Sequence, residues 1–262
     1  MRRLLAGTGW KMNNTVAETR RYGEWFAEWT AGRALSAVDI FVLPPFTSLH
    51  AAATAFAGTP VATGGQNMHW LDSGGWTGEI SAPMLLEAGC RYVELAHSER
   101  LQHFGETYDC VRLKVDAAMK VGLTPIICLG ESASEKESGR ADAVLAEQVL
   151  TSLAGQPEAA TADVVLAYEP RWAIGGAEAA TPEYIAARHA ALRQVLRQHR
   201  GARAAEDTRI IYGGSVTPEN GKEILAIEDV DGLFVGRAAW KPEGFARIIE
   251  LVAEASRLRA AR

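Results

Sequence analysis

The sequence predicts an α/β protein of the closed (β/α)8 barrel class, built as a single domain over residues 1–262. Short apolar runs alternate with longer amphipathic segments along the chain, which is typical of a parallel sheet covered by helices. The alternation gives eight strands, and about 250 residues is the usual size of a barrel of eight such units. No G-x-G-x-x-G motif follows the first apolar run, which disfavours a dinucleotide-binding sheet.

The expected strands are the short apolar runs. Several are rich in Val, Ile and Leu without polar alternation, as expected for strands buried on both faces of a parallel sheet. The eight runs are Leu4–Gly9, Val38–Leu43, Val61–Gly65, Tyr92–Leu95, Thr124–Leu129, Val164–Tyr168, Arg209–Tyr212 and Gly232–Val235.

The expected helices lie between these runs, and two of them begin with a clear start signal. Thr181 and Pro182 supply an N-cap and a proline at the first helical position, and Thr217 and Pro218 repeat the pattern. The expected helices are Val16–Thr30, Ser81–Glu87, Tyr108–Val121, Asp142–Leu153, Pro182–His199, Pro218–Leu225 and Glu243–Leu258.

Composition narrows the range of functions. The chain has 27 Lys+Arg against 32 Asp+Glu, a formal net charge of -5, so neither nucleic acid nor an anionic membrane is expected as a partner. Cys90, Cys110 and Cys128 form no C-x-x-C pair and are expected to be reduced thiols. The N-terminal apolar run is shorter than the roughly 7–15 residues of a secretory signal, so a soluble, cytoplasmic protein is expected.

Three polar residues fall where a barrel enzyme carries its catalytic groups, at the C-terminal ends of strands. Lys11 follows the first expected strand, His97 the fourth and Glu169 the sixth. Together they offer a cation, a hydrogen-bond donor and a base. Each alone has a structural alternative: a solvated lysine, a hydrogen-bonded histidine, or a glutamate that ends a strand before proline. Their shared location favours the functional interpretation.

Glycine-bearing segments follow the later strands: WAIGG at Trp172–Gly176, YGGSV at Tyr212–Val216 and LFVGR at Leu233–Arg237. Glycine lets the backbone approach a ligand closely, and N–H groups at a helix start favour a phosphate. The loops after the seventh and eighth strands of a barrel are its usual phosphate site. Ordinary turns are the alternative, but the combination favours a phosphorylated substrate.

These segments together resemble the triosephosphate isomerase family, over nearly the whole chain. The resemblance implies the TIM-barrel fold, a homodimer, no cofactor or metal, and a small phosphorylated ketose or aldose as substrate. The motifs that carry it are WKMN at Trp10–Asn13, HSER at His97–Arg100, AYEPRWAIGG at Ala167–Gly176, YGGSV, and DGLFVG at Asp231–Gly236, with QNMHW, TGEIS and CLGES between them.

The resemblance implies catalytic roles by matching position. Glu169 is expected to be the base that moves a proton between adjacent carbons. His97 is expected to be the neutral electrophile that polarises the carbonyl; the family's own histidine is a known example of a pKa lowered at a helix N-terminus. Lys11 is expected to neutralise phosphate and enediolate charge, and Glu99 to interact with that lysine.

The resemblance also implies binding roles. Backbone N–H groups of Gly175, Ser215, Gly236 and Arg237 are expected to hold the phosphate. A loop over residues 170–177 is expected to close over the substrate and exclude water. The remaining assignments are Tyr212, Trp172 and Ser215 as the latch of that loop, and Thr77, on a protruding interface loop, as the residue that supports the partner subunit's active site.

The sequence departs from the family pattern in four places. Gly9 replaces an asparagine whose amide lines the pocket, and Arg171 stands where an aliphatic residue is usual. At the loop tip Ala177 and Glu178 replace a glycine and a lysine, and Arg237 replaces the second glycine of the phosphate-binding pair.

Gly9 is the departure that bears on the substrate, because it opens space beside the reacting carbon. With several accompanying segments, it resembles the tetrulose-phosphate branch of the family, the L-erythrulose-1-phosphate isomerases. The expected reaction is conversion of L-erythrulose 1-phosphate to D-erythrulose 4-phosphate through an enediolate.

Three alternatives remain open. One is an ordinary triosephosphate isomerase of glycolysis and gluconeogenesis, which interconverts dihydroxyacetone phosphate and D-glyceraldehyde 3-phosphate. Another is a catalytically inactive protein that binds phosphorylated sugars. The last, a metal-dependent barrel enzyme, is disfavoured because no cluster of His and carboxylate ligands stands out at the strand ends.

Overall fold

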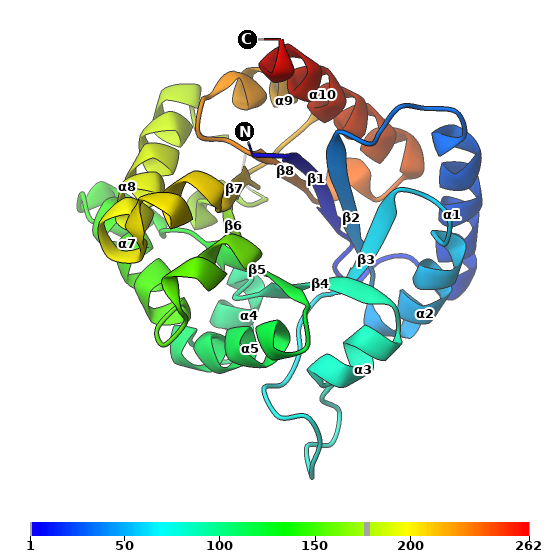
Figure 1. Ribbon diagram of the computed structural model, residues 1–262, viewed down its shortest axis with the longest axis horizontal. Helices are drawn as coiled ribbons and strands as arrows, with labels where there is room; N and C mark the ends of the chain where they lie inside the picture. Colours follow the sequence, from blue (N-terminus) through cyan, green and yellow to red (C-terminus); the bar gives the residue numbers. More distant parts are fainter. Residues whose placement is uncertain (1, 176–178, 262) are drawn as a thin grey trace.

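Eight parallel strands close into a barrel in sequence order, β1 to β8, in the computed structural model, which describes residues 2–175 and 179–261 (Figure 1). Six strands have the bounds predicted from their apolar runs, while β4 begins two residues earlier and β6 one residue later. The strands are β1 Leu4–Gly9, β2 Val38–Leu43, β3 Val61–Gly65, β4 Cys90–Leu95, β5 Thr124–Leu129, β6 Val165–Tyr168, β7 Arg209–Tyr212 and β8 Gly232–Val235.

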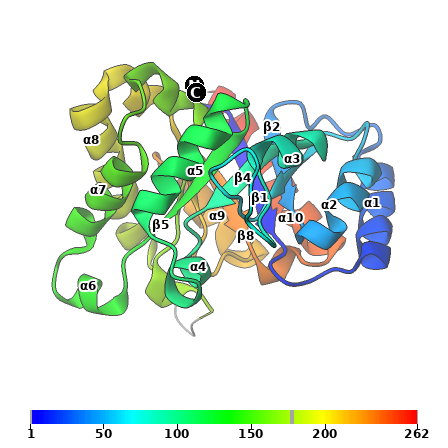
Figure 2. The ribbon, with the colours of Figure 1, turned by 90° about the horizontal axis from the view of Figure 1, so that it is seen from below.

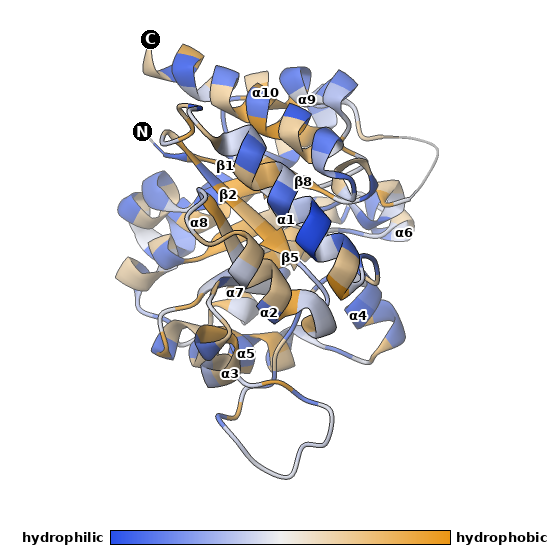
Figure 3. Cartoon of the chain, turned by 90° about the vertical axis from the view of Figure 1, so that its right-hand side faces the viewer, coloured by the Kyte–Doolittle hydropathy of each residue, from blue (hydrophilic) through white to orange (hydrophobic). Residues whose placement is uncertain are grey.

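Helices surround the barrel and bury its outer face, and Figure 3 shows the apolar strands at the centre with polar residues on the outer helices. Within the described ranges no helix has the length and apolar character needed to cross a membrane. The α-helices are α1 Val16–Thr30, α2 Phe46–Ala55, α3 Ala82–Glu87, α4 Ser98–His103, α5 Tyr108–Lys120, α6 Ala133–Glu137, α7 Ala141–Ser152, α8 Pro182–Asp207, α9 Pro218–Ala226 and α10 Pro242–Ala260. Short 3-10 turns are η1 Glu158–Asp163, η2 Arg171–Ala173 and η3 Arg237–Ala239.

The sequence-based helix predictions missed α2, α4 and α6 and ended α8 too early. Helix α2 lacks a start signal, because Pro45 occupies its N-cap position and makes no side-chain cap hydrogen bond. Helices α4 and α6 span only six and five residues, too few to show a helical period. Helix α8 runs beyond the predicted end at His199 to Asp207, but Gly201 interrupts it with φ 86°.

A mostly apolar set of side chains fills the barrel interior. It forms a cluster separate from the larger core between the strands and the helices. Its buried members are Leu5, Phe41, Leu43, Tyr92, Ile126, Cys128, Val165, Ala167, Ile211 and Phe234.

Charged side chains close the barrel at the end where the strands begin. Strand β1 pairs with both β2 and β8, and Arg2 Nε donates to Asp231 Oδ1 at 2.7 Å beside this junction. Arg193 of α8 donates to the other oxygen of Asp231 at 2.7 Å, and Arg209 of β7 pairs with Asp39 of β2 at 2.7 Å. These ion pairs connect the segment before β1 with the start of β8 and with α8, and connect β2 with β7.

The opposite end of the barrel holds the strained backbone. Four non-glycine residues with positive φ among those described are Lys11 (53°), Asn14 (69°), Ala96 (62°) and Ser215 (51°), and each follows β1, β4 or β7. Figure 2 shows α4 and α6, which follow β4 and β5, at one end of the barrel. Such conformations are costly for L-residues and gather at functional sites, so a functional site is expected at the C-terminal strand ends.

Candidate active site

Glu169 lies directly after β6 and packs closely against Gly130 and Gly213, which leave room for it because they have no side chains. The side chain is buried, with 6% of its surface exposed. A Cβ on Gly130, after β5, would lie 1.9 Å from the Glu169 carbonyl oxygen, and a Cβ on Gly213, after β7, would lie 2.8 Å from Glu169 Oε1. Any larger residue at either position would displace the glutamate.

The surroundings of Glu169 make its carboxyl hold a proton tightly. Burial raises the pKa of Glu169 well above its ordinary value, and the negative charge of Glu94 raises it further, while the charge of Lys11 opposes both. A carboxylate in such a place is a much stronger base than one in water, which suits proton abstraction from carbon.

His97 caps the start of α4 and faces Glu169. Its Nδ1 accepts a hydrogen bond from the backbone N–H of Glu99 at 3.2 Å, so the neutral ring carries its proton on Nε2. That Nε2 lies 3.8 Å from Glu169 Oε2. Burial, followed by the charge of Lys11, lowers the pKa of His97 to about 4 although Glu99 opposes the shift. His97 is therefore a neutral N–H donor at physiological pH.

Lys11 joins this group through an ion pair. Its Nζ lies 2.7 Å from Glu99 Oε1, and the other carboxyl oxygen of Glu99 lies 3.6 Å from His97 Nδ1. Burial would raise the pKa of Glu99, but the hydrogen bond from Lys11 and nearby positive charges hold it below its ordinary value. Gln66 Nε2 donates to the Lys11 carbonyl at 2.9 Å and supports the backbone there.

The segments expected to bind phosphate follow β6, β7 and β8 at the same end. Ser215 Oγ donates to the carbonyl of Ala173 at 2.6 Å, which joins the loop after β7 to the loop after β6. Gly175 has φ 67°, and Gly236 immediately precedes η3, whose first residue, Arg237, has an exposed side chain. Their contact with a phosphate stays a prediction.

The base of the loop after β6 is anchored on Glu131, a residue that the sequence-based assignment did not include. Glu131 is buried and accepts hydrogen bonds from Trp172 Nε1 at 2.7 Å, from Tyr184 at 2.9 Å and from Tyr168 at 3.2 Å. It therefore holds β6, the loop and α8 together. The signal for it was its place at the end of the fifth apolar run, in CLGES.

Arg171 has a structural explanation. Its Nη2 donates to Glu135 of α6 at 2.7 Å, a pair that an aliphatic residue cannot make.

The buried hydroxyl of Tyr212 has no hydrogen-bond partner among the described residues, so its role as a latch of the loop stays a prediction. The loop-tip departures at Ala177 and Glu178, and the last glycine of WAIGG, lie outside the described residues.

Gly9 is not required by the packing of the barrel. A Cβ at position 9 would lie 3.6 Å from Phe234 Cζ and 3.7 Å from Glu94 Oε2, which are ordinary contact distances. At Gly7, in contrast, a Cβ would lie 2.0 Å from Phe41 Cζ. The fold therefore needs glycine at position 7 but leaves position 9 open to a side chain.

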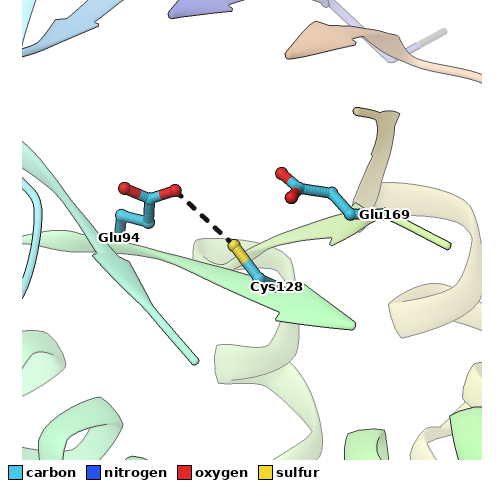
Figure 4. Close-up of side chains that lie close together, drawn as sticks. All are labelled: Glu94, Cys128 and Glu169. Carbon is cyan, nitrogen blue, oxygen red and sulfur yellow. Dashed lines mark hydrogen bonds between the residues drawn. The ribbon is translucent and has the colours of Figure 1, made fainter. Parts of the chain in front are cut away.

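Glu94, which lies beside Gly9, was not among the site residues predicted from the sequence. Side chains alternate along a strand, so Glu94 of β4 points into the barrel like Tyr92, and this register was the available signal. Figure 4 shows Glu94 and Glu169 extending toward each other above Cys128, whose thiol donates to Glu94 Oε1 at 3.7 Å.

No cluster of metal ligands was expected from the sequence, but Glu94, Cys128 and Glu169 form a group of possible ligands. One ligand atom from each of Glu94, Cys128 and Glu169 lies within 4.8 Å of the others, an arrangement that can hold a metal ion. Burial raises the pKa of all three groups, that of Glu94 to about 7. A cation there must therefore displace protons that burial retains.

Thr77 lies apart from the barrel mouth. The segment between β3 and α3 projects outward from the molecule (Figures 1 and 3), and Thr77 is exposed on it. Trp76 beside it is 49% exposed, and its ring contacts His69 at a centroid distance of 4.5 Å.

A closed (β/α)8 barrel with a buried carboxyl, a neutral histidine and a lysine at its C-terminal end has the form of an acid–base barrel enzyme. A family model described as triosephosphate isomerase matches residues 4–252. The chain belongs to the triosephosphate isomerase family and is an isomerase of a phosphorylated sugar.

Two groups of relatives resemble the chain equally well. An L-erythrulose-1-phosphate isomerase of Brucella abortus (strain 9-941) is 45% identical over 95% of this chain and 96% of its own. A triosephosphate isomerase of Solibacter usitatus is 44% identical over 95% of this chain and 99% of its own. Another, of Symbiobacterium thermophilum, is 46% identical over 97% of this chain and 99% of its own. Overall sequence identity thus does not distinguish between the two substrates, and the distinction depends on the residues of the site.

Proposed function

We propose that the enzyme converts L-erythrulose 1-phosphate to D-erythrulose 4-phosphate. The observation that carries the proposal is Gly9, where the barrel accepts a Cβ at ordinary contact distance and yet has none. The relatives named L-erythrulose-1-phosphate isomerase support it. L-Erythrulose 1-phosphate is dihydroxyacetone phosphate with a hydroxymethyl group in place of one hydrogen on the carbon that loses its proton. A missing side chain beside that carbon suits the larger substrate.

The first chemical step is proton removal by Glu169. Its carboxylate takes the proton from the hydroxyl-bearing carbon next to the carbonyl, and the released electron pair forms the carbon–carbon double bond of an enediolate. The negative charge then develops on the former carbonyl oxygen. His97 Nε2–H donates to that oxygen, and Lys11 supplies a positive charge beside it; such preorganised donors are needed because the carbon is a weak acid.

The second step returns the proton to the neighbouring carbon. The protonated Glu169 delivers it there. The hydroxyl on the carbon that was first deprotonated loses its proton as the new carbonyl forms, and this proton passes through His97 to the former carbonyl oxygen, which becomes a hydroxyl. Backbone N–H groups of Gly175, Ser215, Gly236 and Arg237 hold the phosphate throughout. Loop closure excludes water while the enediolate exists.

A substrate comparison tests the proposal. Initial rates with L-erythrulose 1-phosphate and dihydroxyacetone phosphate, each followed by NMR, give two values of kcat/KM. We expect the four-carbon substrate to be preferred. Preference for dihydroxyacetone phosphate would instead support an ordinary triosephosphate isomerase, which the relatives of that name favour. No turnover of either would support a sugar-phosphate-binding protein.

The proposal includes a homodimer formed through the projecting segment. Met12, beside Lys11, is 95% exposed, and Trp76 on the segment is 49% exposed. Tryptophan and methionine are enriched in protein interfaces, and in this interface Thr77 would support the partner's active site. A fully active monomer in sedimentation at micromolar concentration would contradict the homodimer.

The proposal also includes a cytoplasmic location. The three free cysteines suit such a reducing compartment.

A further inference from the structure

Glu94 is a carboxyl group in the mostly apolar interior of the barrel. It is 6% exposed and lies beside Gly9 of β1 and Cys128 of β5. Placing a carboxyl there is costly unless hydrogen bonds compensate it. Its one hydrogen-bond partner within the described ranges is the weak thiol donor of Cys128, at 3.7 Å from Oε1.

Glu131 shows what a structural carboxyl looks like in the same protein. It is also buried, but it accepts hydrogen bonds from one tryptophan N–H and two tyrosine hydroxyls. Buried polar groups that serve the fold are normally satisfied in this way. Glu94 is not: within the described ranges its Oε2 accepts no hydrogen bond, so this oxygen is available to accept one from a bound molecule.

The position of Glu94 indicates what that partner is. Its Oε2 faces the place where Gly9 lacks a side chain, 3.7 Å from the missing Cβ. A carboxyl oxygen of Glu94 also lies within 4.8 Å of one of Glu169 (Figure 4). Glu94 therefore lies between the open position on β1 and the base that removes the proton.

We propose that Glu94 is the residue that selects the four-carbon substrate, by hydrogen bonding to its hydroxymethyl group. The inference rests on the proposed function, since only that substrate carries this group. The reacting carbon must lie about 3–3.5 Å from the base. A hydroxyl on a carbon attached there lies about 2.4 Å from the reacting carbon, within reach of a second carboxyl group less than 4.8 Å from the base. Gly9 provides the room and Glu94 the hydrogen bond.

The test distinguishes the effect of the hydrogen bond from Glu94 on the rate from the effect of the space beside Gly9. L-Erythrulose 1-phosphate is compared with its analogue that has a methyl group in place of hydroxymethyl. The wild-type enzyme should prefer the hydroxyl-bearing substrate about 10- to 100-fold in kcat/KM, the range for a hydrogen bond to a charged group. Glu94→Leu, similar in size, should bring the ratio close to one, and Glu94→Gln should give an intermediate ratio.

Tyr92→Phe is the matched control. It alters the preceding interior side chain of β4 by one hydroxyl and should leave the ratio unchanged. Equal discrimination by wild type and folded Glu94→Leu would overturn the inference. So would a wild-type enzyme that turns over both compounds equally, a measurement that does not depend on any variant folding.

The same experiment distinguishes the inference from the proposed function. A wild type that prefers dihydroxyacetone phosphate overturns the proposed function, and the inference fails with it. A wild type that prefers L-erythrulose 1-phosphate but does not distinguish the methyl analogue leaves the function standing and overturns only the role of Glu94.

Discussion

Placing an asparagine at position 9 should reverse the substrate preference. In Gly9→Asn the new Cβ meets Phe234 and Glu94 at 3.6 and 3.7 Å, so the backbone and the barrel wall accept it without strain. Replacing a strand glycine recovers about 0.5–1 kcal/mol of conformational entropy. The variant should therefore fold, and its effect should appear in the kinetics.

The size of the effect follows from what the amide displaces. Beyond the Cβ it adds three heavy atoms beside Glu94, where the hydroxymethyl group is proposed to lie. Loss of room for one methylene is worth about 1–3 kcal/mol, or 10- to 200-fold in kcat/KM. We expect kcat/KM for L-erythrulose 1-phosphate to fall about 100-fold more than that for dihydroxyacetone phosphate.

The assay is initial-rate kinetics on both substrates, with Gly9→Ala as the graded control. The alanine methyl group should give a smaller penalty of the same sign. Gly7→Ala, whose Cβ would lie 2.0 Å from Phe41, should instead reduce stability and both activities together. Equal losses on both substrates in Gly9→Asn would refute the steric reasoning.

Three further predictions concern the base and its surroundings. Glu169→Gln removes the proposed base and should lower kcat about 10²- to 10⁴-fold with an unchanged melting temperature; retention of wild-type kcat would assign the proton transfer elsewhere. Gly130→Ala places a Cβ 1.9 Å from the Glu169 carbonyl and should cost about 1–3 kcal/mol of stability as well as lower kcat, whereas an unchanged kcat would show that Glu169 tolerates the shift. Burial raises the pKa of Glu94 from 4.5 to about 7, so the folded protein retains this proton while the unfolded chain loses it, and stability falls as pH rises through that window. Urea unfolding at pH 5 and pH 8 should show Glu94→Gln gaining up to about 3 kcal/mol relative to wild type, and a pH-independent difference would contradict the burial of the charge.

The strands were predictable because a strand buried on both faces is mostly apolar. The run Val38–Leu43, apolar except for Asp39, was therefore bounded correctly. Helix α2 was not predictable, since its start depends on the preceding β-strand and loop and not on a capping side chain.

The candidate site was predictable only in part. Lys11, His97 and Glu169 could be predicted from their places after strands, because a parallel barrel brings the carboxyl ends of its strands together. Glu94 could not be predicted in this way, because it lies inside β4. A lone acidic residue in a strand is usually exposed, and only the inward register of β4 and the absence of a side chain at Gly9 give it meaning. That juxtaposition depends on distances across the barrel, which local sequence does not contain.

The junction of β1 with β8 has a consequence for synthesis of the protein. Arg2 and Asp231 lie 229 residues apart in sequence, so the first strand acquires its second neighbour only when nearly the whole chain has been made. At roughly 5–20 residues per second, β1 keeps an unpaired edge for on the order of ten seconds or longer. Unpaired strand edges are templates for association with other chains. The edge of β1 that pairs with β8 in the finished barrel is therefore open to association with other chains until the last strand has been made.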